Sequence, residues 1–191
     1  CQPFYLHKVG VVQMAVVFAA FAREPAAVTL GDEHQRHEWL SMADAAWDGY
    51  KGQGKFQGGT VPLRALMVAY PNRMHVVTVD GTGINKFADL KGKRVSTGAP
   101  NSATELMAAR VLEAMGLTND DFKRERLDPG KSVDAIKDKK LDAFFWVGGL
   151  PTAGVTGLAN TPGLTIKLID HAELVGKMNA KYGNLYVEDA I

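Results

Sequence analysis

The sequence predicts an α/β fold with mainly parallel sheets, because apolar runs of strand length alternate with segments of helical period. Residues 74–79 (MHVVTV) and 141–147 (LDAFFWV) are such runs, rich in β-branched and aromatic residues. Between them, an apolar stripe at i, i+3 spacing predicts a helix, and it is formed by Leu106, Ala109, Leu112 and Met115. Glycine and proline separate these segments, as expected of turns.

The first regular elements follow Ser41, which is a candidate N-cap for a helix that ends near Tyr50. The ten residues after Tyr50 include four glycines, which predicts a loop. Residues 63–70 predict a buried strand, which Pro71 stops. After the strand at 74–79, residues 86–90 predict a short helical turn.

The most informative segment comes next and spans residues 89–105 (DLKGKRVSTGAPNSATE). Residues 93–97 predict a short strand that turns sharply into a helix, with Asn101 or Ser102 as the N-cap. Ser102 and Glu105 have the spacing of a capping box. A helix that begins directly after a strand directs unpaired N–H groups and the positive end of its dipole at the same space, which favours an anion. The alternative is that Ser102 only caps its own helix.

The pattern continues to residue 182. The remaining predicted elements are a short helix capped by Thr118, a helix at 132–139, the strand at 141–147, a small-residue helix that ends near 159, a strand at 164–169 and a helix at 172–182. Ligands of α/β sheets bind outside the carboxyl ends of the strands. Two segments lie at such ends, 101–104 and 145–148, although Trp146 fits the core equally well.

Composition excludes several function classes. The 191 residues suffice for one large domain or two small lobes, and a net charge of +1 gives no reason to expect a nucleic-acid surface. The single cysteine, Cys1, rules out an intramolecular disulfide and a cysteine-based zinc site. Residues 9–22 form an apolar run too short to cross a membrane; it fits a signal peptide or a buried helix, and we expect the helix.

No catalytic or metal-binding motif is found. His34, His37 and Glu38 occur in the order H-x-x-H-E, which matches neither zinc-protease pattern, so we expect a surface cluster. Phosphate-binding loops, dinucleotide fingerprints and nucleophile elbows are also missing from the sequence. We therefore expect a binding protein that is not an enzyme and needs no cofactor or metal, and Asp44 is the one residue we would nominate for catalysis.

Three ordered blocks resemble a known family: LRALMVAYPNRMHVV, FADLKGKRVSTGAPNSATELMAARVLEAMGL and DAIKDKKLDAFFWVGGLPTAGV. They are similar to the TAXI-type solute-binding proteins of TRAP transporters, from about Ser41 to Tyr186. The resemblance implies a two-lobed fold like that of periplasmic binding proteins, with residues 1–72 and 149–191 in the first lobe and 75–147 in the second. The family's glycine-rich TGG-type loop is not found in residues 1–40, so we expect an incomplete first lobe.

The resemblance also implies a function. The protein would be a periplasmic, or extracellular and membrane-associated, receptor that binds a small carboxylate such as glutamate or a dicarboxylate. It would deliver the carboxylate to a TRAP membrane permease and act as a monomer. By motif, the ligand site would comprise Ser41, Met42, Asp44, Asn101, Ser102, Thr104, Trp146, Val147 and Gly148. The alternatives are an enzyme, or a fragment that does not bind, on the same fold.

Overall fold

The computed structural model describes residues 10–14, 17–18, 42–53, 56–62, 65–67 and 72–190. Side chains are described within 46–53, 56–62 and 72–189.

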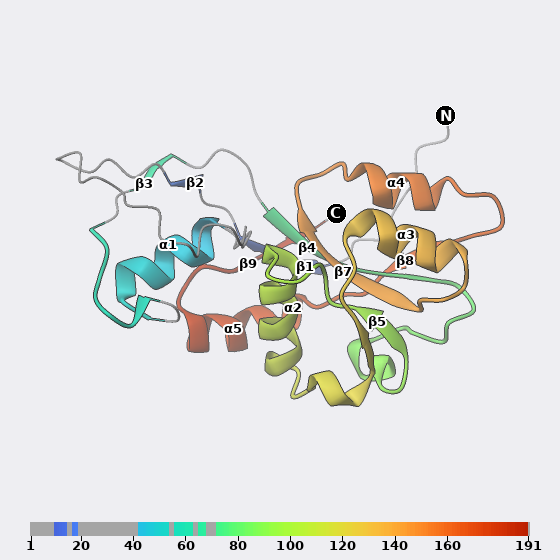
Figure 1. Cartoon of the computed structure of the whole chain (residues 1–191), viewed down its shortest axis with the longest axis horizontal. Helices are drawn as coiled ribbons and strands as arrows, with labels where there is room; N and C mark the ends of the chain where they lie inside the picture. Colours follow the sequence, from blue (N-terminus) through green and yellow to red (C-terminus); the bar gives the residue numbers. More distant parts are fainter. Residues whose placement is uncertain are drawn as a thin grey trace.

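A seven-stranded mixed sheet organises the described residues (Figure 1). Its order is β6-β5-β7-β4-β1-β9, and β8 also pairs with β4. The strands are β1 (Gly10–Met14), β4 (Asn72–Val79), β5 (Arg94–Ser96), β6 (Lys123–Glu125), β7 (Ala143–Gly148), β8 (Ile166–Leu168) and β9 (Val187–Ala190).

The α/β prediction is confirmed, and the parallel strands are β6, β5 and β7. These strands are parallel because helices connect them: α2 (Ala103–Ala114) follows β5, and α3 (Pro129–Lys137) follows β6. The sheet is mixed because β4 runs antiparallel to β7, β8 and β1, and β1 runs antiparallel to β9.

Helices cover both faces of this sheet. Helix α2 packs on one face together with α5 (Val175–Tyr182), and α3 packs on the other with α4 (Ala153–Ala159). Side chains along β7 alternate between these layers: Phe145 and Val147 contact the α2 layer, and Phe144 and Trp146 contact the α3 layer. A strand buried on both faces explains the uninterrupted apolar run of β7.

The apolar run at residues 9–22 is where the helix prediction is wrong. Its described parts, β1 and β2 (Val17–Phe18), are strands, and β2 pairs with β3 (Ala65–Met67) in a separate two-stranded sheet. β-Branched valines favour extended backbone, and β1 finds partners in β4 and β9 on both sides.

The other predicted elements agree with the structure within a few residues. They are α1 (Met42–Lys51), the 3₁₀ helices η3 (Phe87–Leu90), η4 (Asn119–Asp121) and η5 (Ala172–Leu174), and α2 to α5. The division into two lobes stays a prediction. Strands β1 and β9, assigned to the first lobe, lie in the same sheet as β5 and β7 of the second.

Helix α1 contacts β2, and its side chains also contact residues of α2 and the end of α5. The indole of Trp47 lies against Gly183, where an added Cβ would come within 2.6 Å of the ring. The Asp48 carboxylate accepts a hydrogen bond at 3.5 Å from Arg110 of α2. Arg110 is buried, donates to the Tyr186 hydroxyl at 2.7 Å, and stacks over the Tyr182 ring at 4.6 Å.

Candidate functional site

The turn between β5 and α2 depends on Gly98. Its φ of +96° is a conformation that favours glycine. An added Cβ would lie 2.7 Å from Cβ and Cγ2 of Thr104, so the absence of a side chain lets the turn lie against the first turn of α2. Of the two predicted N-cap candidates, Asn101 and Ser102, the structure has Ser102, whose Oγ accepts a hydrogen bond from Glu105 N at 3.1 Å.

The start of α2 presents donors at the carboxyl end of β5. The backbone N–H groups of Ala103 and Thr104 belong to the first helical turn, which has no intrahelical acceptors for them. The Ser102 hydroxyl still has a proton to donate, because its oxygen acts as the acceptor in the cap. This donor set, at the positive end of a 12-residue helix, is suited to an anion.

A hydrogen bond joins this helix start to the end of β7. Val147 N donates to Thr104 Oγ1 at 3.3 Å, and Thr104 is 4% exposed. Because β5 and β7 are parallel, their carboxyl ends lie on the same edge of the sheet. The contact therefore brings two of the predicted site segments, 101–104 and 145–148, together.

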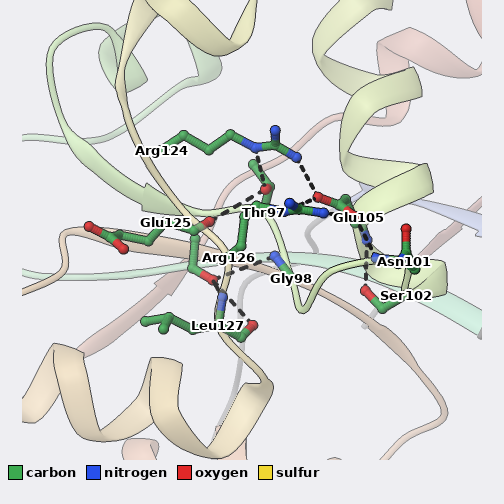
Figure 2. A network of polar contacts seen from close by, with 10 residues as sticks. Thr97, Gly98, Asn101, Ser102, Glu105, Arg124, Glu125, Arg126 and Leu127 are labelled. Atoms are coloured by element: carbon green, nitrogen blue, oxygen red, sulfur yellow. Dashed lines mark hydrogen bonds and ion pairs between the residues drawn. The ribbon is translucent and has the colours of Figure 1, made fainter. Parts of the chain in front are cut away.

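Two arginines flank the site and share Glu105 (Figure 2). Arg124 donates to Glu105 Oε1 at 2.6 Å and to Thr97 Oγ1 at 2.9 Å. Arg126 binds the same carboxylate through Nε at 2.6 Å and Nη2 at 2.9 Å. Two guanidinium groups against one carboxylate leave the surroundings of the α2 start positive.

Glu105 departs from the predicted capping box. Its carboxylate accepts from the backbone N–H of Asn101 at 2.7 Å, so Ser102 caps the helix without the reciprocal bond from its own N–H to Glu105. Burial raises the pKa of Glu105, but the hydrogen bonds from Arg126 and Asn101 and the charge of Arg124 outweigh it, so the pKa lies below its ordinary value. The carboxylate is thus ionised at neutral pH.

The sequence of this chain matches a known protein family over most of its length. Residues 39–188 match the model of the NMT1-like family. The chain belongs to the NMT1-like family.

Solved structures give weaker similarities to this NMT1-like protein. The periplasmic aliphatic sulphonate binding protein SsuA from Escherichia coli has 21% identity and a TM-score of 0.42, over 51% of this chain and 31% of that chain. A putative sulfonate-binding protein from Methylobacillus flagellatus KT has 24% identity and a TM-score of 0.42, over 51% and 27%. The alkanesulfonate-binding protein from Xanthomonas axonopodis pv. citri bound to MOPS has 20% identity and a TM-score of 0.35, over 59% and 43%. The NMT1-like chain thus spans less than half the length of each of these proteins.

The structure brings some of the nine predicted site residues together and separates others. Thr104 and Val147 are in contact, and Ser102 and Gly148 lie within two residues of them in the chain. Asn101 is exposed and has a φ of +60°. Trp146 faces the α3 layer, where its Nε1 donates to Thr152 Oγ1 at 3.0 Å. Ser41 lies outside the described residues; Met42 and Asp44 are in α1, but their side chains are not described.

Sequence reasoning missed Arg124 and Arg126. Two other arginines of the same sheet are already paired, Arg73 with Asp189 and Arg94 with Asp142. The signal that could have found the missed pair is the alternation R-E-R at 124–126, which places both arginines on one side of a short strand.

His34, His37 and Glu38 lie outside the described residues. Within the described ranges, no group of three or more His, Cys, Asp or Glu side chains is arranged to hold a metal ion. In the same part of the chain, no helix combines the length and apolar character needed to cross a bilayer.

Proposed function

We propose that this protein is an extracytoplasmic solute receptor that binds a small carboxylate at the start of α2. In this proposal the carboxylate is an amino acid such as glutamate, or a dicarboxylate, and the receptor delivers it to a TRAP-type membrane permease. The protein would act as a monomer of TAXI type in the periplasm, or outside the cell at the membrane. Residues 1–72 with 149–191 and residues 75–147 would form two lobes that close on the ligand.

The observation that carries the proposal is the hydrogen bond from Val147 N to Thr104 Oγ1. It fixes the N-terminus of a helix beside the carboxyl end of a neighbouring parallel strand, which is where α/β sheets bind ligands. Membership of the NMT1-like family and the resemblance of three sequence blocks to TAXI receptors support a receptor on independent grounds.

The chemistry of the α2 start supports an anionic ligand. A carboxylate can accept from the Ser102 hydroxyl and from the backbone N–H groups of Ala103 and Thr104. Hydrogen bonds to a charged group contribute roughly 1.5–3 kcal/mol each. The excess positive charge of Arg124 and Arg126 over Glu105 adds long-range attraction, which salt would weaken.

We also propose that the protein binds its ligand and does not catalyse a reaction. The receptor hypothesis uses donors that hold an anion, and it requires no nucleophile or general base. If the protein were an enzyme, Asp44 would be the candidate catalytic residue. A bound carboxylate that is recovered chemically unchanged after long incubation with the protein would count against the enzymatic alternative.

Titration calorimetry with glutamate, succinate, a sulfonate of similar size and 1,5-diaminopentane, a cation without a carboxylate, tests the proposal. We expect saturable binding of at least one carboxylate and none of the diamine. Binding only of the sulfonate would keep the anion site but overturn the carboxylate class.

The double variant Ser102→Ala, Thr104→Ala locates the site. It should weaken carboxylate binding by at least about 10-fold, since one lost charge-assisted hydrogen bond already accounts for that factor. The matched control is Thr118→Ala, which removes the capping residue of η4, an element that follows the opposite end of α2. Unchanged affinity in a double variant that retains its melting temperature would place the ligand elsewhere.

A further inference from the structure

A second concave site lies on the other face of the sheet, between α4 and strands β4 and β8. We call it the α4 pocket, and it has a volume of about 390 Å³, within the usual range for small-molecule sites. Its wall is mostly apolar and includes Val155, Ala159, Ile166 and Leu168, and His75 of β4 also lines it. In Figure 1, helix α4 lies at the upper right and β8 lies below it on the same side of the picture.

His75 is the exceptional member of this wall. It is 1% exposed, and neither Nδ1 nor Nε2 has a hydrogen-bond partner among the described residues. A buried polar group without a partner costs about 1–3 kcal/mol. Burial is also the main reason that the pKa of His75 falls to about 4; backbone groups of Trp146 and Arg73 close to the ring act against it, and the charges of His171 and Arg73 act with it. The imidazole is therefore neutral at pH 7, with one nitrogen as donor and the other as acceptor.

The α4 pocket is separate from the proposed anion site. Residues 75, 77 and 79 of β4 point to the α3 layer, as Val77 and Val79 show by their packing. Thr104 and α2 lie on the opposite face with Met74 and Val76. A ligand in the α4 pocket is thus divided from the start of α2 by the thickness of the sheet.

We propose that the α4 pocket binds a neutral, mainly apolar molecule that carries one hydroxyl group, and that His75 is the hydrogen-bond partner of this hydroxyl. The apolar wall disfavours a charged ligand, because a buried charge needs compensating partners. A hydroxyl suits the imidazole, since it can donate to the unprotonated nitrogen or accept from the protonated one. Both nitrogens are buried in this structure, so the imidazole would turn toward the α4 pocket on binding, and one of the two unpartnered nitrogens would then be satisfied.

Isothermal titration with 4-propylphenol and propylbenzene tests the proposal on the whole chain. The two probes differ in one hydroxyl group. We expect 4-propylphenol to bind about 2- to 10-fold more tightly, the factor that a typical net hydrogen bond gives. In His75→Phe, propylbenzene should still bind while the preference for the phenol disappears. Equal binding of the two probes, no binding of either, or a preference that survives His75→Phe would overturn the proposal.

Two further variants keep the test decisive if His75→Phe does not fold. Ala159→Phe narrows the α4 pocket from helix α4 and should weaken both probes. Unchanged binding of both probes to folded Ala159→Phe would place them elsewhere and overturn the proposal. The double variant Ser102→Ala, Thr104→Ala should leave 4-propylphenol binding unchanged, so that failure of the anion site and failure of this pocket are distinguishable.

Discussion

Single residues hold the candidate site in its geometry, and Gly98 is the clearest case. It meets two demands, a positive φ and the close approach of Thr104, whereas Gly81 meets only the first: its φ is +88°, but nothing lies within 4 Å of an added Cβ. The pair therefore separates backbone strain from steric overlap.

Gly98→Ala should destabilise the protein by more than Gly81→Ala. The backbone strain of a non-glycine residue at positive φ costs about 1–3 kcal/mol in both variants, and the overlap with Thr104 adds to it only at Gly98. Urea unfolding followed by circular dichroism measures both losses. If the two variants lose equal stability, the contact between the turn and α2 does not matter energetically.

His75 makes stability depend on pH. Its pKa is about 4 in the folded state against 6.5 ordinarily, so between these values the unfolded chain takes up a proton that the folded protein does not. Stability should fall as pH falls from about 6.5 to 4, by up to about 3 kcal/mol relative to His75→Phe. Unfolding free energies of both proteins across this range give the difference directly, and His171 and the carboxylates cancel in it. A difference that is constant with pH would show that His75 is not held neutral.

At the scale of elements, Arg110 connects α2 to α1, α5 and the segment before β9. Arg110→Met should loosen α1, because Asp48 loses its buried cationic partner and Tyr186 its donor. Breaking a buried pair costs about 3–5 kcal/mol, so a loss near 3 kcal/mol is expected for this long ion pair. Hydrogen exchange should rise first in residues 42–51.

The control for Arg110 is Lys167→Met, which breaks an exposed ion pair with Asp80. Surface pairs contribute about 0–1 kcal/mol, so little change is expected. Equal protection of α1 in the unchanged protein and in Arg110→Met would mean that its other contacts, among them Trp47 with Gly183 and the contact with β2, are sufficient to attach this helix.

Glu105 joins β6 to α2 and predicts a second dependence on pH. Glu105→Gln removes the charge that both Arg124 and Arg126 contact, while side-chain size is kept. Because the folded pKa of Glu105 is lowered, its stabilisation is present above the unfolded pKa and is lost as pH falls through the folded value. The unfolding free energies of the two proteins should differ at pH 7 and converge in acid. A stability loss that persists unchanged at pH 2 would assign the effect to packing.

At the scale of the whole molecule, sequence patterns predicted the α/β class and most elements from residue 42 onward. Apolar periodicity and the N-cap at Ser102 were sufficient for this, because each acts within a few residues. They failed for β6 and β9, because the short, charged sequences KRE and VEDA have no apolar alternation. They also failed for β1, which forms a strand by pairing with segments far away in the sequence. That Thr104 and Val147 lie together could be predicted from the strand ends. The R-E-R alternation indicates that Arg124 and Arg126 share one side, but not that this side faces Glu105, because that depends on the pairing of β6 with β5.

The position of β1 has a consequence for synthesis on the ribosome. Gly10 pairs with Ala190, so β1 receives this outer neighbour only when the chain up to about residue 190 has left the exit tunnel. Until then, the β1 edge stays unpaired, and open edges favour association with other chains. The β5, β6 and β7 region closes over shorter chain distances and can form earlier. A nascent chain stalled before residue 187 should therefore hold a protected β5–β7 region and a β1 edge that chaperones recognise.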